Sequence, residues 1–373
     1  MDEVEKELKP VLHKAARDNI VITMTMNAGM TDLLLNFICS AKKSNVAVDQ
    51  LVLFPTDDDA VGVAKNLQVA QYRHASFGDF PKEEAATYGD NAFVAMMWIK
   101  VLCVYLPVNL GYSVLFQDAD IVWLRNPLQE FFAQPNLSGD HDVYFQVDLC
   151  ALIVHLRRAK SCWLHFLART TRGLVEVEHY TCALTRLIVC QDDGSRSTRF
   201  APYFANSGFY FLRNNPRTKY FMTMLLYQGD QIIEWRSHQT ALVQTLADAS
   251  SKFGLKVKVL SYHDFPSGKD YHNRKPYMKA WLKGDERPYA FHMCWTANKV
   301  DKVKYLKQLG GWFMHRNCNA TSLADPRWLS QGALQDTCCS AEPVVDCFFR
   351  DKASMAPGCP NSPNKDKGQP SWW

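Results

Sequence analysis

The chain has 373 residues, and its 42 lysines and arginines against 38 aspartates and glutamates give a formal net charge of +4. A hydrophobic fraction of 47% is that of an ordinary globular protein and excludes the disordered and fibrous classes. The small net charge argues against a nucleic-acid partner. No apolar run reaches the length of a membrane span, and the charged residues 1–18 lack the apolar middle of a signal peptide.

The first part of the chain alternates between short β-branched runs and helical patterns. Strands are predicted over residues 19–26, 51–54, 66–73 and 113–117, and helices over 31–44, with Thr31 as N-cap, and 91–106, ending before Pro107. Strands separated by helices of this length indicate an α/β fold, with a mostly parallel sheet covered by helices on both faces. Ligands of such sheets bind beyond the carboxyl ends of the strands.

Five of the twelve cysteines lie near the C-terminus: Cys318, Cys338, Cys339, Cys347 and Cys359. Their surroundings are polar and without apolar periodicity, so we expect disulfides to hold this segment together. Zinc is the alternative, although no C-x₂-C pair occurs and adjacent cysteines suit tetrahedral ligation poorly. Disulfides, together with the sequons at Asn136 and Asn319, favour a secretory-pathway lumen.

Asp118 and Asp120 directly follow the buried strand predicted over 113–117. Side chains at i and i+2 share a face while the chain is extended, so both carboxylates can point into one crevice. Two close carboxylates repel each other unless a cation lies between them, and Mg²⁺ or Mn²⁺ suits oxygen ligands and substrate phosphates. The alternative is a solvated aspartate turn. The apolar residues on both sides favour the metal site.

Around this motif the chain resembles the nucleotide-diphospho-sugar transferases of glycosyltransferase family 77, which are retaining enzymes with the GT-A fold. The likeness covers residues 19–311 apart from one insert. Five motifs in the family's order carry it: TMNAGMTDLLLNF (25–37), GYSVLFQDADIVWLRNP (111–127), FAPYFANSGFYFLRNN (200–215), SHQTAL (237–242) and FHMCWTANK (291–299). The resemblance implies a GT-A-like domain over 19–311, an N-terminal helix or stem remnant over 1–18, and a cysteine-rich extension over 312–373.

The resemblance also implies roles for individual residues. Asp120 would be the main ligand of Mn²⁺ or Mg²⁺, with Asp118 touching the donor and the metal, and His292 would be the third ligand. The other residues implied are Thr25 and Asn27 at the uridine, Lys100 and Lys299 near the phosphates, Gly208 against the sugar, and Asn206 and Gln239 near the anomeric carbon. Each of these side chains has a purely structural alternative. At His238 the chain departs from the family, which usually has an acidic residue there.

The function implied is metal-dependent, retaining transfer from a UDP-sugar to a glycan or glycoprotein acceptor. The metal would stabilise the negative charge that develops on the β-phosphate. One alternative is a catalytically inactive nucleotide-sugar-binding protein. Another is a metal-dependent nucleotidyl- or phosphotransferase, although neither G-x-x-x-x-G-K-[ST] nor G-x-G-x-x-G is present. The expected location is the Golgi or another secretory compartment, as a type II membrane protein whose anchor lies outside this chain.

Two further expectations concern the insert and the tryptophans. Residues 147–191 separate DVYFQ from DDGSRSTRFAPYFANSG, which the family pattern would join. The segment is either a retained intron translated in frame or a genuine surface insertion with helices over 156–172 and 175–189.

Trp98, Trp123 and Trp295 are expected in the core rather than as sugar-stacking platforms.

Overall fold

The computed structural model describes residues 2–46, 48–78, 80–85, 89, 91–147, 168–170, 173–175, 202–296, 298–318, 337–349 and 352–355. They belong to two compact units, one made of residues 1–148 and 198–373 and the other of residues 149–197. In the smaller unit, β7 (Ala168–Thr170) and β8 (Gly173–Val175) form an antiparallel hairpin. The sequence predicts helices over 156–172 and 175–189, but residues 168–170 and Val175 lie in these strands instead. The β-branched side chains of Thr170 and Val175 favour strand over helix. The rest of both predicted helices lies outside the described residues.

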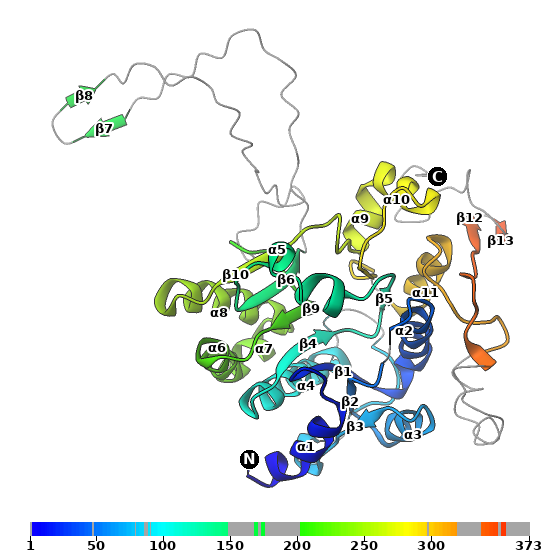
Figure 1. Cartoon of the computed structure of the whole chain (residues 1–373), viewed down its shortest axis with the longest axis horizontal. Helices are drawn as coiled ribbons and strands as arrows, with labels where there is room; N and C mark the ends of the chain where they lie inside the picture. The colour runs from blue at the N-terminus through cyan, green and yellow to red at the C-terminus, as the bar shows by residue number, and fades with distance from the viewer. Residues whose placement is uncertain are drawn as a thin grey trace. The chain divides into compact units, whose positions relative to one another are not determined.

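The larger unit is built on a seven-stranded sheet in the order β10-β6-β9-β4-β1-β2-β3 (Figure 1). Its strands are β1 (Ile20–Met26), β2 (Leu51–Pro55), β3 (Ala70–Gln71), β4 (Ser113–Gln117), β6 (Val143–Val147), β9 (Ala205–Leu212) and β10 (Val257–Leu260). Only β9 is antiparallel to its neighbours, so the other six strands share one direction. The predicted α/β class and mostly parallel sheet are confirmed.

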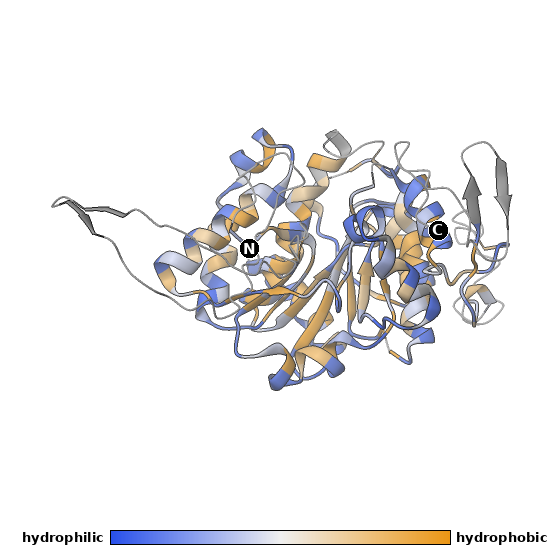
Figure 2. Cartoon of the chain, turned by 90° about the horizontal axis from the view of Figure 1, so that it is seen from above, coloured by the Kyte–Doolittle hydropathy of each residue, from blue (hydrophilic) through white to orange (hydrophobic). Residues whose placement is uncertain are grey.

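Helices cover both faces of this sheet. One core contains residues of α2 (Thr31–Lys43), α3 (Asp58–Asn66), α9 (Gly268–Asn273), α10 (Lys275–Lys283) and α11 (Lys299–Gln308). The opposite core contains residues of α1 (Asp2–Ala15), α4 (Asn91–Asn109), α6 (Pro216–Leu226), α7 (Gly229–Glu234) and α8 (His238–Phe253). Within β1, Ile22 and Met24 face the first core and Val21 faces the second. Figure 2 accordingly shows strands that are hydrophobic between more polar helix surfaces.

Three predicted boundaries differ from the structure. Helix α4 runs through Pro107 to Asn109, because burial of Val104, Leu106 and Val108 favours the last turn even though the proline removes one hydrogen-bond donor. The strand predicted over 66–73 is reduced to the two residues of β3. Thr31 is not the N-cap of α2, because a 3₁₀ turn precedes the helix and the Thr31 hydroxyl donates to the Ala28 carbonyl at 2.6 Å.

Covalent and polar links tie the C-terminal segment to α2. The disulfides Cys39–Cys339 and Cys318–Cys338 confirm the prediction of disulfides in the extension. The buried amide of Asn36 donates to the Gly311 carbonyl at 2.9 Å and accepts from the Phe313 amide at 2.7 Å. Strands β12 (Cys347–Phe349) and β13 (Lys352–Met355) follow, and Cys359 lies outside the described residues.

The described residues also bear on membrane spans and on one of the two sequons. In the part of the chain that the structure describes, no helix is long and apolar enough to cross a membrane. Asn136 is exposed on the short helix α5 (Pro135–Ser138), where a glycan can be accommodated. The sequon at Asn319 lies outside the described residues.

Candidate functional site

Strand pairing brings two aspartates and a distant histidine together. Asp118 and Asp120 lie between β4 and β5 (Ile121–Trp123), and β5 pairs with β11 (Ala290–His292) so that His292 stands opposite Ile121. The His292 Nε2 lies 3.3 Å from Asp120 Oδ1 and 4.0 Å from Asp118 Oδ2. The three side chains can each offer one ligand atom within 4.8 Å of the others.

The orientation of the His292 ring is set by Gln146, the penultimate residue of β6. The Gln146 Nε2 donates to the carbonyls of Phe265 and Pro266, at 3.0 and 2.7 Å. Its Oε1 is therefore the atom that faces His292 Nδ1, at 2.9 Å, and Nδ1 must carry the proton of that hydrogen bond. The lone pair of a neutral His292 is thus on Nε2, which faces the aspartates. Sequence reasoning did not identify Gln146, because only the fold shows its contact with His292.

A divalent cation fits these residues. Two carboxylates and a neutral imidazole form a donor set that Mn²⁺ accepts more readily than Mg²⁺ does. Gly208 on β9 leaves the space beside them open, because a Cβ there would lie 2.4 Å from His292 Cε1 and 2.6 Å from Asp118 Oδ2. The backbone of Gly208 also accepts a hydrogen bond from the Asp118 amide at 2.8 Å.

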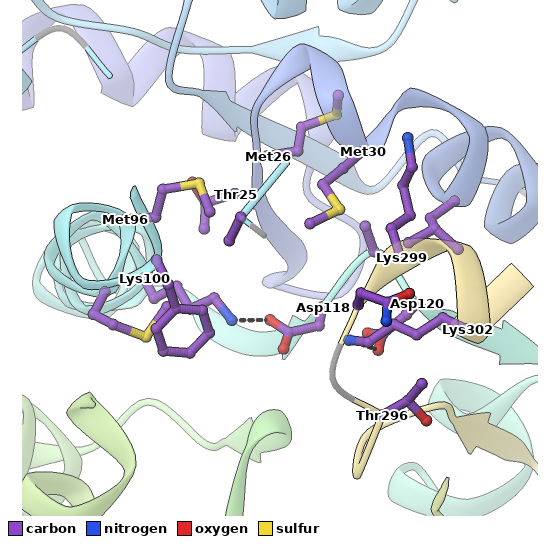
Figure 3. Close-up of a pocket in the computed structure, with 16 residues that line it drawn as sticks. Thr25, Met26, Met30, Met96, Lys100, Asp118, Asp120, Thr296, Lys299 and Lys302 are labelled. Carbon is purple, nitrogen blue, oxygen red and sulfur yellow. Dashed lines mark hydrogen bonds and ion pairs between the residues drawn. The ribbon is translucent and has the colours of Figure 1, made fainter. Parts of the chain in front are cut away.

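Two lysines neutralise the aspartates, one from each side (Figure 3). Lys100 Nζ on α4 lies 2.6 Å from Asp118 Oδ1, and Lys302 Nζ on α11 lies 2.7 Å from Asp120 Oδ2. Burial opposes the ionisation of Asp120, but the charge of Lys302 outweighs it and holds the pKa of Asp120 well below its ordinary value. Lys302 is absent from the sequence-based set, although its spacing of three residues from Lys299 on one helix face could have indicated it.

These groups border one pocket. Its charged lining consists of Lys100, Lys299 and Lys302 with Asp118 and Asp120, a formal charge of +1, and Thr25 also lines it. Its apolar lining includes four methionines, Met26, Met30, Met96 and Met97, together with Leu33, Ala85, Phe93 and Ala119. Lys299 Nζ donates to the Gly29 carbonyl at 2.7 Å and lies 3.4 Å from Glu84 Oε1. A positive pocket with an apolar wall suits an anionic ligand that carries an aromatic or sugar ring.

The remaining sequence-predicted residues lie around this pocket rather than in its lining. Asn27 is buried, and its Nδ2 donates to the carbonyls of Pro81 and Glu83 at 3.1 and 2.5 Å. Asn206 Oδ1 accepts from the Gly208 amide at 2.7 Å. Gln239 Oε1 accepts from the amide and hydroxyl of Ser207, at 3.3 and 3.2 Å. Asn206 and Gln239 therefore brace the start of β9, which presents Gly208 to the aspartates.

His238 does not supply the charge that an acidic residue would bring to its position. It is buried, with Nδ1 2.9 Å from Met97 Sδ. Burial, together with the nearby charge of Lys100, lowers the pKa of His238 to about 3. The imidazole is therefore neutral at pH 7.

The tryptophans differ from one another in exposure. Trp123 is fully buried and Trp98 is partly buried against the core, as predicted. The prediction for Trp295 is wrong, because 43% of this residue is exposed. It lies three residues after the end of β11, on the segment that leads to α11.

The profile of the nucleotide-diphospho-sugar transferases matches residues 46–306. The chain belongs to this family.

Similar proteins are known by sequence and by structure. A UDP-galactose:fucoside alpha-3-galactosyltransferase of Dictyostelium discoideum is 22% identical over 337 residues, 80% of this chain and 44% of that protein. A beta-arabinofuranosyltransferase of Arabidopsis thaliana is 21% identical over 325 residues, 80% of this chain and 48% of its own length. The chain thus spans less than half of these relatives. Mouse xyloside xylosyltransferase 1 matches 75% of this chain and 99% of its own, with 11% identity and a TM-score of 0.39.

Proposed function

We propose that this chain is a metal-dependent, retaining glycosyltransferase that moves a sugar from a UDP-sugar to a glycan or glycoprotein acceptor. The observation that carries the proposal is the convergence of Asp118, Asp120 and the His292 Nε2 lone pair at the edge of a positively charged pocket. The donor named for the Dictyostelium discoideum relative, UDP-galactose, supports the choice of a uridine nucleotide.

The difficult step is departure of the nucleoside diphosphate from the anomeric carbon. Asp118, Asp120 and His292 would hold Mn²⁺, or Mg²⁺, which supplies Lewis-acid stabilisation of the charge on the leaving phosphates. Lys299 and Lys302 line the same pocket from α11 and can donate to phosphate oxygens. Gly208 leaves room for the sugar beside the aspartates, while Asn206 and Gln239 hold this part of β9 in place. Thr25 and Asn27, at the end of β1, are the residues we assign to the uridine side.

We place the enzyme in the lumen of the Golgi or another secretory compartment. Two disulfides and an exposed sequon at Asn136 support this, because disulfides persist in oxidising compartments. On this proposal residues 19–311 form the transferase domain, residues 1–18 are an N-terminal helix or stem remnant, and residues 312–373 are a cross-linked extension.

The proposal is tested by screening UDP-sugars for turnover. Purified chain, with and without residues 147–191, is incubated with UDP-galactose, UDP-xylose or UDP-arabinofuranose, with Mn²⁺ or EDTA, and UDP release and product anomer are measured. We expect turnover with Mn²⁺ only, and a loss of about 10²–10³-fold in Asp120→Asn. Asp49→Asn, at an exposed ion pair with Arg17, is the control. Binding of UDP-sugar without turnover would instead favour an inactive binding protein, and transfer of a phosphate would favour a phosphotransferase.

A further inference from the structure

Trp295 is exposed although it lies three residues after a buried histidine of the metal site. Its exposed fraction is 43%, while His292 and Met293 are both buried. Its backbone φ is +58°, in the left-handed region that L-residues with a side chain rarely adopt. Such strain is unfavourable and persists where the surroundings require it, often at functional sites. The exposed position of the indole is therefore imposed by the fold rather than by local preference.

Lys269 approaches this indole from α9. Only 6% of Lys269 is exposed, and its Nζ lies 5.0 Å from the centre of the Trp295 ring. Among the described residues, no hydrogen-bond acceptor or carboxylate pairs with this ammonium. Burying a charge without a hydrogen-bonding partner is unfavourable, and a cation–π contact offsets only part of that cost. An oxygen atom of a ligand would accept hydrogen bonds from donors of Lys269 that no described residue accepts.

The segments that carry these two residues also hold the metal-site histidine. The His292 amide donates to the Pro266 carbonyl at 3.2 Å, and Ser267 forms a β-bridge with His292. Gly268 allows the two backbones to touch, because a Cβ there would lie 1.8 Å from the Cys294 carbonyl oxygen. Thr296, the residue after Trp295, lines the charged pocket. The Lys269–Trp295 pair therefore adjoins the pocket without being part of it.

We propose that Lys269 and Trp295 form the acceptor subsite of the enzyme and bind one sugar ring of the acceptor. The C–H face of the ring would lie on the exposed indole, and the Lys269 ammonium would donate to the ring's hydroxyl oxygens. An aromatic wall with one or two convergent polar groups is the usual composition of a small-molecule site. This inference rests on the proposed function, because it assumes that a sugar is transferred at the adjoining pocket.

The first test compares transfer with donor hydrolysis. Trp295→Ala, Trp295→Phe and Lys269→Met are assayed with Mn²⁺, the active UDP-sugar and methyl glycosides of fucose, galactose and xylose. We expect the ratio of transfer to hydrolysis to fall about tenfold in Trp295→Ala and Lys269→Met, and to recover partly in Trp295→Phe. The matched control is Tyr227→Ala, which truncates an aromatic residue with an exposed fraction of 83% at the end of α6. Equal losses of transfer and hydrolysis, or an unchanged ratio, would overturn the inference.

A second test separates this inference from the proposed function. Saturation-transfer NMR of the full chain with the same three methyl glycosides detects sugar binding without any turnover. Signals that are present with the unmodified chain and Tyr227→Ala but lost with Trp295→Ala support the subsite, whether or not a donor is consumed. Absence of signals from the unmodified chain overturns the subsite. Absence of donor turnover with any UDP-sugar counts against the proposed function alone.

Discussion

Gln146 and His292 are joined by a hydrogen bond of 2.9 Å that determines which nitrogen of the imidazole faces the aspartates. The Gln146 amide cannot reverse, because its Oε1 would then face the carbonyl oxygens of Phe265 and Pro266. The neutral His292 tautomer with its proton on Nδ1 is therefore favoured before any ligand arrives. Partners of this kind are as much a part of a metal site as the ligands themselves.

We expect Gln146→Met to weaken Mn²⁺ binding by about 10–100-fold, because the side chain keeps its length but no longer accepts from His292 Nδ1. Isothermal titration of the metal measures the affinity, and ¹⁵N chemical shifts of labelled histidine report the tautomer directly. Gln50→Met, at a surface amide that donates to the Ile20 carbonyl, is the control. Unchanged Mn²⁺ affinity in Gln146→Met would show that the tautomer is set by other groups.

Lys302→Met should destabilise the metal-free protein, because Asp120 is 4% exposed and would lose an ammonium group 2.7 Å away. Breaking a buried pair costs up to about 3–5 kcal/mol. Mn²⁺ would replace the lost positive charge, so the rise in Tm on adding Mn²⁺ should be larger in the variant than in the unmodified chain. Scanning calorimetry measures the Tm of each metal-free protein and the rise in Tm when Mn²⁺ is added. Lys304→Met, at an exposed pair with Asp301, serves as the control, and an equal rise in all three proteins contradicts the prediction.

Gly208→Ala should abolish most metal-dependent turnover, because the added Cβ would collide with His292 and Asp118. Overpacking of this kind also lowers the free energy of unfolding by about 1–3 kcal/mol. The comparison is Gly62→Ala on α3, where a Cβ meets no atom within 4 Å and should be neutral or stabilising. UDP release and urea denaturation are measured on both variants. Full turnover in Gly208→Ala would remove the steric argument for the metal pocket.

His238 should make the protein less stable in acid. The pKa of His238 is lowered from 6.5 to about 3 in the folded state, so the unfolded chain binds a proton that the folded chain does not. The stabilisation of the folded state by neutral His238 is complete above pH 6.5. It is lost as the pH falls towards 3, by up to about 1.4 kcal/mol per pH unit. His238→Asn should flatten this dependence, whereas His13→Gln, on the exposed face of α1, should not. Urea denaturation between pH 7.5 and pH 5 measures the free energy of unfolding of the unmodified chain and of both variants. If this free energy depends on pH in the same way in all three proteins, the prediction is refuted.

The sequence was sufficient for the α/β class, for the strand that leads into Asp118 and for the disulfide extension, since periodicity and cysteine placement are local signals. The family motifs, and not the local sequence pattern, predicted that His292 lies beside the aspartates. In the structure this proximity depends on the pairing of β5 with β11. Gln146, Lys302 and Trp295 were missed or misplaced. Their importance depends on contacts between segments far apart in the chain, and neither hydrophobicity nor spacing records those contacts.

The Cys39–Cys339 bridge joins cysteines 300 positions apart, which constrains how the molecule can be made. During synthesis, Cys39 emerges from the ribosome long before its partner has been translated. Its thiol therefore cannot pair with Cys339 until all the intervening residues have been synthesised. Closure of this bridge must follow the synthesis of Cys339, and a nascent chain that stops before Cys339 cannot acquire it.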